Sequence, residues 1–122
     1  MFSVDPVLDL LSHRLDACAL RQAVYAANIA NANTPGYHPL EVSFENELAD
    51  AAQFSKGAPF SAQAALLQMT QPRVVAASAD SVELDQQMVL MTKNAVQYQT
   101  LLNAFEKSMS LLRLAALEGR ES

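Results

Sequence analysis

The stretch SVELDQQMVLMTKNAVQYQTLLNAFEKSMSLLRLAAL, residues 81–117, decides the fold expected for this chain of 122 residues. Its apolar residues recur at alternating spacings of three and four, which is the heptad period of a coiled-coil helix. We call this stripe the seam, and it consists of Leu84, Met88, Met91, Ala95, Tyr98, Leu102, Phe105, Met109, Leu112 and Ala116. Asp80 and Glu83 have capping-box spacing, and Gly119 is placed to act as a C-cap. One unbroken helix over 81–117 is therefore predicted.

A second long helix is predicted near the N-terminus, over 6–32. Asp5 followed by Pro6 is a helix-start signal, because proline at the first helical position loses no hydrogen bond. The same three-and-four spacing then links Leu8, Leu11, Leu15, Cys18, Tyr25, Ile29 and Ala32, if polar Gln22 is allowed one place in the stripe. Pro35 and Gly36 suit the two central positions of a type II turn, which ends the helix.

The residues between the helices, 33–80, predict a long and irregular middle segment. It holds every proline and glycine of the chain except Pro6 and Gly119. Apolar spacing after Ser43 favours a short helix near 44–52, and 73–77 is expected to be extended. The predicted fold is all-α, one domain over 1–122. Its two long helices pack as a coiled-coil-like pair joined by this segment.

The predicted helix lengths indicate that the chain needs partners. A helix over 81–117 is about 55 Å long, whereas a compact chain of this size has a radius of gyration of only about 14 Å. The first helix can cover only part of the second, so several turns of the seam are left without an internal partner. Such apolar patches usually mark interaction surfaces. The fold is therefore expected to be elongated and dependent on assembly.

Composition and charge exclude several classes of protein. The net charge of −5 and eight scattered Lys and Arg residues give no basic stripe, so nucleic acid is not expected as a partner. No apolar run approaches the roughly 18 residues of a membrane span. Asp5 and Asp9 lie where a secretory signal would carry positive charge, and Arg14 is the first basic residue. No cleavable signal peptide is therefore expected.

The sequence shows no residues that could carry catalysis. Cys18 is the single cysteine, and it is interpreted as a small apolar helix residue. His13 and His38 are 25 residues apart and have neither His-Glu-x-x-His spacing nor a neighbouring cluster of Cys or carboxylates, and no glycine-rich phosphate loop is present. We therefore expect no enzymatic activity, no metal, no cofactor and no small-molecule substrate.

The run ANIANANTPGY, residues 27–37, resembles the N-terminal signature shared by flagellar rod, hook and hook-associated axial proteins. The matching positions are Asn28, Ile29, Ala30, Asn31, Thr34, Pro35, Gly36 and Tyr37. The chain is short, with no room for the large inserted domains of hook or distal-rod proteins. Residues 44–48, 82–88 and 94–99 are similar to the corresponding parts of the short rod members of this family.

This resemblance implies a structural subunit of the proximal rod in the bacterial flagellar basal body. Family members leave the cell unfolded through the flagellar type III apparatus, and their terminal helices pack into concentric layers. The implied partners are other copies of the chain, the rod protein FlgC, the adaptor FliE, the membrane ring and the export gate. Two alternatives stay open, namely FlgC itself and, from another class, a cytosolic helical export chaperone or adaptor.

Overall fold

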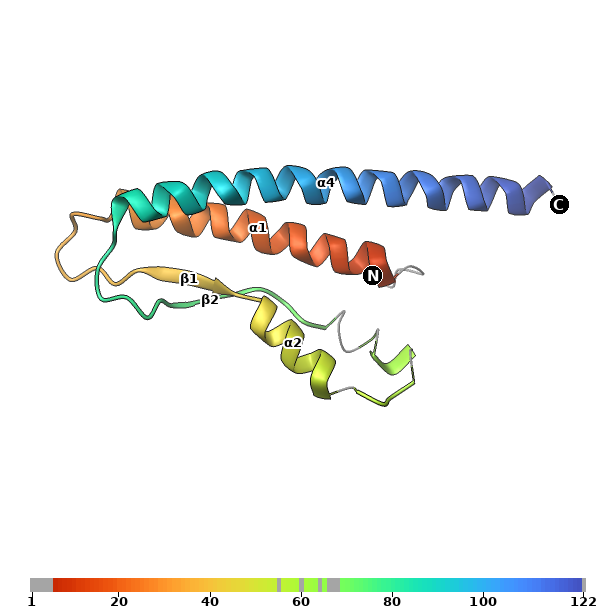
Figure 1. The fold of residues 1–122 in the computed structure, drawn as a ribbon, viewed down its shortest axis with the longest axis horizontal. Coiled ribbons are helices and arrows are strands. Elements are labelled where there is room, and N and C mark those ends of the chain that lie inside the picture. The colour runs from red at the N-terminus through yellow and green to blue at the C-terminus, as the bar shows by residue number, and fades with distance from the viewer. Residues whose placement is uncertain (1–5, 55, 60, 64, 66–68, 122) are drawn as a thin grey trace.

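The computed structural model describes residues 6–54, 56–59, 61–63, 65 and 69–121. Two long helices, α1 (Pro6–Ala30) and α4 (Leu84–Glu121), pack side by side and antiparallel (Figure 1). Between them the chain forms strand β1 (Leu40–Ser43), helix α2 (Glu45–Phe54) and strand β2 (Arg73–Ala76). The predicted pair of long helices joined by a middle segment is confirmed, and this segment holds a small two-stranded sheet.

The bounds of α4 differ from the expected range at both ends. The helix begins at Leu84 rather than Ser81, because residues 78–83 form a non-helical connection between the last rung of the ribbon, Ala77 N to Pro39 O, and the helix. Glu83, whose carbonyl accepts from Gln87 N at 3.0 Å, therefore lies at the helix start, and the predicted capping box does not form. At the other end the helix runs through Gly119, which lacks the positive φ of a C-cap glycine.

Helix α1 ends at Ala30, two residues before the expected end. Its last turn tightens, since Ala32 N donates to Ile29 O at 3.3 Å and Thr34 N donates to Asn31 O at 3.0 Å. The predicted N-cap, Asp5, lies outside the described residues. Pro6 does begin the helix. At this first position a backbone N–H would have no acceptor within the helix, so proline loses no hydrogen bond there.

The two strands form an antiparallel ribbon that sequence analysis did not predict. Leu40 pairs with Ala76 and Ser43 pairs with Arg73, and the bond from Ala77 N to Pro39 O extends the ladder by one rung. The stretch expected to be extended, 73–77, supplies β2, whereas its partner β1 was not expected. The ribbon lies beneath α1 and contacts it through β1 (Figure 1).

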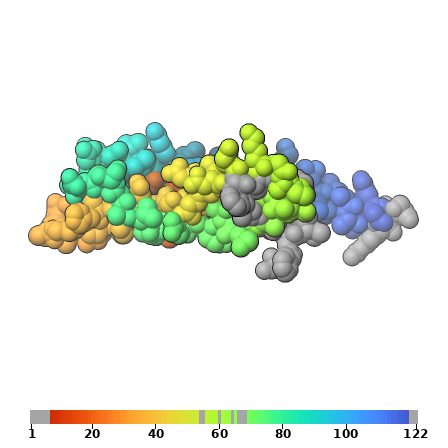
Figure 2. All heavy atoms as spheres, turned by 90° about the horizontal axis from the view of Figure 1, so that it is seen from below, coloured from red at the N-terminus to blue at the C-terminus, as the bar shows by residue number. Residues whose placement is uncertain are grey.

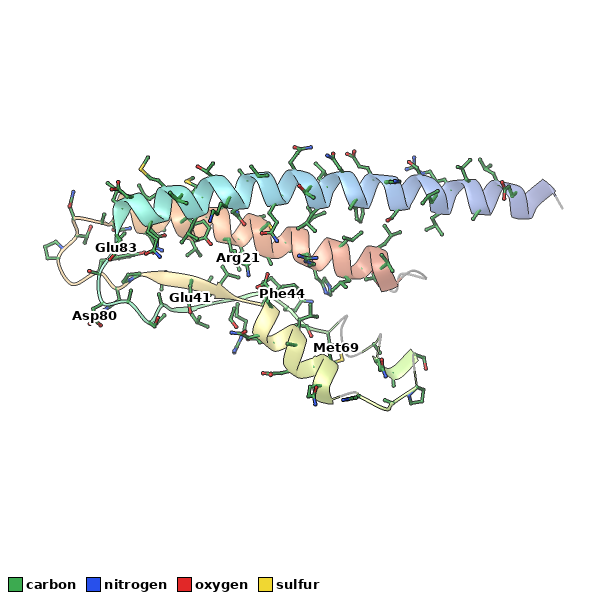
Figure 3. The ribbon with its side chains drawn as sticks, viewed as in Figure 1. Arg21, Glu41, Phe44, Met69, Asp80 and Glu83 are labelled. Atoms are coloured by element: carbon green, nitrogen blue, oxygen red, sulfur yellow. The ribbon has the colours of Figure 1, made fainter. Side chains whose placement is uncertain are left out.

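Helix α2 is held to its neighbours by one buried aromatic and two ion pairs. Phe44, which is 1% exposed, lies where β1 passes into α2, below α1 (Figure 3). Arg21 of α1 forms an ion pair with Glu45, and Arg73 of β2 pairs with Glu47 at 2.6 Å. Surface ion pairs contribute at most about 1 kcal/mol, so burial of Phe44 dominates this junction.

The core is small and lies around α1, against α4 and against the junction of β1 and α2. Its buried apolar residues in the described part of the chain are Leu8, Ala17, Cys18, Val24, Phe44 and Leu101. Helix α4, with 38 residues, is about 57 Å long, whereas α1, with 25 residues, is about 38 Å long. The C-terminal part of α4 therefore extends beyond α1 as a single helix (Figure 1), and its blue end projects past the rest of the molecule in Figure 2. No described helix is both long enough and apolar enough to cross a bilayer.

Candidate assembly interface

The signature residues build a tight turn at the end of α1. Tyr37 N donates to Thr34 O at 3.2 Å, which places Pro35 and Gly36 at the central positions of a four-residue turn. Gly36 has a φ of 77°, the value that a type II turn requires at its third position. The predicted turn type is therefore confirmed, and only glycine adopts this backbone without strain.

Asn28 is the centre of this region, because its side chain joins four parts of the fold. The residue is fully buried. Its Nδ2 donates to Leu40 O at 2.9 Å and to Gln87 Oε1 at 3.0 Å. Its Oδ1 accepts from the Tyr37 hydroxyl at 2.8 Å and from Leu40 N at 3.0 Å. One amide thus uses both its donors and both its acceptor sites to tie α1 to the turn, to β1 and to α4.

The other signature positions support this arrangement. Asn31 donates through Nδ2 to Ala27 O at 2.9 Å, and its Oδ1 accepts from the Thr34 hydroxyl at 3.1 Å. Ala27 O also accepts from Asn31 N at 3.0 Å, so Asn31 closes the end of the helix through both its backbone and its side chain. Ile29 is half-buried and Ala30 is exposed.

A second buried amide, Asn94, joins the middle of the two helices. Asn94 is 5% exposed, and its Nδ2 donates at 2.8 Å to both Cys18 O and Gln22 Oε1. Its Oδ1 is buried without a hydrogen-bond partner among the described residues. The polar Gln22 admitted into the apolar stripe is therefore the partner of Asn94.

The row of α4 that faces α1 lies one position before the seam. Gln87, Asn94 and Leu101 are spaced by seven residues, and each is half-buried or buried. The seam residues Met88, Ala95 and Leu102 follow directly after them. The polar partners Asn28 and Gln22 on α1 select the earlier row, which a rule based on apolar spacing alone does not detect.

The seam is consequently open to solvent along much of its length. Leu84, Met88, Ala95, Tyr98, Leu112 and Ala116 are exposed, whereas Met91, Leu102, Phe105 and Met109 are half-buried. Ala95 and Tyr98 line a groove of about 380 Å³ between the helices, together with Cys18 and Ala19. Part of the seam therefore lies beside α1 but remains exposed to solvent.

Two further apolar surfaces of α4 are exposed. Val89 and Val96, spaced by one heptad, are 53% and 64% exposed. From Ser110 to Gly119 every side chain is exposed, which includes Leu111, Leu112, Leu114 and Leu117. We call residues 110–121 the overhang. Exposed leucines on several sides of one helix are unusual for a monomer and indicate an interaction surface.

The described residues offer no cluster suited to metal binding. No group of three or more His, Cys, Asp or Glu side chains comes together among them. His13 is half-buried and His38 is exposed. Burial raises the pKa of the Cys18 thiol, and burial likewise raises the pKa of the Tyr25 hydroxyl. Both shifts favour the neutral form and fit packing residues rather than reactive groups.

Comparison with known proteins defines the class to which this fold belongs. A family model described as "Flagella basal body rod protein" matches residues 8–38, which contain most of α1, the turn and Asn28. The fold and this match define a flagellar rod protein.

Three relatives define the family further, and each is named flagellar basal body rod protein FlgB. The chain is 32% identical to the protein from Escherichia coli (strain K12), over 83% of this chain and 86% of that protein. It is 28% identical to the protein from Aeromonas hydrophila, over 98% of each chain. It is 51% identical to the protein from Borreliella burgdorferi over 41 residues, which cover 33% of this chain and 30% of that protein.

The chain belongs to the FlgB family of flagellar basal body rod proteins, and it is a structural rod subunit of the basal body. Membership in this family argues against FlgC and against a cytosolic chaperone.

Proposed function

We propose that this subunit belongs to the proximal part of the rod and acts there as one rod-protein domain over 1–122. Its helix pair forms part of the axial shaft, and neighbouring subunits cover the apolar faces left open on α4. The observation that carries this proposal is the exposure of the seam and of the overhang, which α1 is too short to cover. Burying about 25 cal/mol per Å² of such surface would drive assembly.

The signature turn has a different role in this proposal. Asn28 and the Pro35–Gly36 turn fix the direction in which the chain leaves α1, so the ribbon and α2 lie on one side of the helix pair. The seam lies on α4, and neither the turn nor the ribbon covers its exposed members. The signature residues therefore shape the subunit, whereas the seam residues contact its neighbours.

The partners of this surface are proposed from the family. Other copies of the chain, the rod protein FlgC and the adaptor FliE would cover the open helix faces, next to the membrane ring and the export gate. We also propose that the chain reaches the periplasmic rod through the flagellar type III route, without a cleaved signal peptide. No small molecule, cofactor or nucleic acid is part of this function.

Isolated basal bodies provide the test. In a strain that lacks the native gene, an epitope-tagged copy of the chain should restore motility, and the tag should be found at the membrane-proximal end of the rod. Photo-crosslinking residues at Met88 and Leu114 should capture neighbouring rod subunits or FliE. A tag found in the hook or the cytosol, in motile cells, would overturn the proposed position. Unchanged export after inactivation of the export gate would overturn the proposed route.

A further inference from the structure

We propose that Asn94 sets the register of α1 against α4 and thereby keeps the overhang free for assembly. The buried amide sits in the row of α4 that faces α1, one heptad after Gln87 and one heptad before Leu101. Coiled-coil rows repeat every seven residues, so apolar packing alone distinguishes poorly between registers that differ by one heptad. A single buried Asn is a known way to select one register at a cost in stability.

The hydrogen bonds of Asn94 are specific to the observed register. Nδ2 reaches the carbonyl of Cys18 and the side chain of Gln22, which lie one turn apart on α1. A slip of one heptad moves Asn94 by about 10.5 Å and breaks both bonds. Asn28 opposes the same slip through one hydrogen bond to Gln87, while its remaining bonds go to the turn and β1. Asn94 therefore carries most of the described polar resistance to sliding.

The overhang supplies a reason for the helices to slip. Moving α4 by seven residues, so that Ala19 lies beside Leu102 instead of Ala95, would place part of the exposed overhang against α1. This slip buries leucines that are otherwise open, and Leu101 would replace Asn94 opposite Gln22. Burying the Oδ1 of Asn94 without a hydrogen-bond partner costs free energy, so stability alone does not favour an amide at this position. We infer that it holds the pair in the register that leaves the assembly surface uncovered.

Cysteine pairs can measure the register directly in the purified full-length chain. In a Cys18→Ala background, Ala19→Cys is combined either with Ala95→Cys, which reports the observed register, or with Leu102→Cys, which reports the slipped one. Ala19 and Ala95 are exposed and line the same groove, so a short thiol-bridging reagent can reach both. The intramolecular product is identified as a monomer by electrophoresis and mass spectrometry.

With Asn94 present, bridging to position 95 should dominate. Asn94→Leu should lower the ratio of observed to slipped bridging about tenfold or more, because two hydrogen bonds specific to the register are lost. The unfolding midpoint should stay equal or rise, which separates a loss of register from a loss of folding. Asn103→Leu is the matched control, because Asn103 is an exposed amide on the same helix and its loss should leave the ratio unchanged.

Asn94→Ala repeats the test without added bulk, in case the leucine variant does not accumulate. An unchanged ratio in these variants would overturn the inference. Such a result would leave the assignment of the chain to the rod intact, because the register concerns the packing within one subunit.

Discussion

The hydroxyl of Tyr37 donates a 2.8 Å hydrogen bond to Oδ1 of Asn28, nine residues earlier in the chain. This bond spans the turn at Pro35 and Gly36 and brings the chain back against the helix that it has just left. The same Oδ1 accepts from Leu40 N, so the turn and the first strand share one anchor. The end of α1 is therefore fixed by a side chain within the helix rather than by a terminal cap.

Replacement of this anchor should destabilise the chain more than any other change in the turn. Asn28→Ala leaves polar groups of half-buried Leu40 and Gln87 without their partner, which should lower the free energy of unfolding by on the order of 3 kcal/mol. Tyr37→Phe removes one hydrogen bond and should cost about 0.5–1.5 kcal/mol. Denaturant unfolding measures both. Asn33→Ala, at an exposed position of the same turn, is the control, and an equal loss there would contradict the role of Asn28.

Gly36 should tolerate no β-branched residue. Its φ of 77° lies in the left-handed region, so Gly36→Val should cost at least about 1–2 kcal/mol and redirect the chain after α1. No heavy atom lies within 4 Å of the added Cβ, so backbone strain rather than steric clash is the expected cause. Rod assembly should fail while export continues. Gly119→Ala, in a helical backbone, is the matched control and should assemble normally. Full motility with Gly36→Val would argue against this role of the turn.

Three substitutions on α4 should separate folding from assembly. Leu102→Asp places a carboxylate on the half-buried seam, so the variant should be exported yet leave cells without filaments. Leu101→Asp changes a residue that is 6% exposed, and it should lower the stability of the isolated chain by several kcal/mol. Lys93→Asp changes the charge of an exposed side chain, and such changes usually stay within about 0.5 kcal/mol.

Motility, secretion and unfolding assays are needed together for this comparison. Motile cells with Leu102→Asp would show that the seam is not an assembly surface. Equal loss of stability in the Leu101 and Leu102 variants would place the seam within the fold of the single subunit instead.

Hydrogen exchange should divide α4 into two parts in the isolated chain. Amides of residues 87–105 lie in the stretch packed against α1, whereas the side chains from Ser110 to Glu118 are all exposed. A lone helix of about twelve residues is marginal in water, so the overhang should exchange much faster. Protection of 111–118 equal to that of 94–101, in a proven monomer, would contradict this division.

The thiol of Cys18 should react slowly at neutral pH. Its pKa is raised by burial, so the reactive thiolate is scarce, and the side chain is 1% exposed. Because the folded pKa lies above the unfolded one, the folded state loses stability as pH rises through the thiol range, and none is lost below it. Alkylation rates with and without denaturant, and unfolding curves across alkaline pH, measure both effects. Cys18→Ala should remove this part of the pH dependence.

Much of the fold could be predicted because it rests on local signals. The heptad spacing predicted α4, and Pro35 with Gly36 predicted the type of turn and the end of α1 to within two residues. The ribbon could not be predicted, because four-residue strands about thirty residues apart carry no local sign of their pairing. The start of α4 was missed for a related reason, since a non-helical connection, residues 78–83, leads from the ribbon to Leu84.

The candidate interface was predictable in its residues but not in its orientation. The apolar repeat located the seam, yet α1 lies against the row of Gln87 and Asn94. Amides such as these resemble surface residues in a sequence, because their burial depends on partners far away in the chain. Asn28 was noted as part of a motif, but its four hydrogen bonds come from three separate segments.

The rung between Ala77 N and Pro39 O closes the middle segment at its base, next to the pairing of Leu40 with Ala76. The chain therefore departs from the helix pair and rejoins it at almost one place. Residues can be added or removed beyond this closure, around Lys56 and Gly57, without altering the spacing between the helices. The part of the middle segment beyond this closure can therefore change in length and in composition during evolution, while the packing of α1 against α4 stays the same.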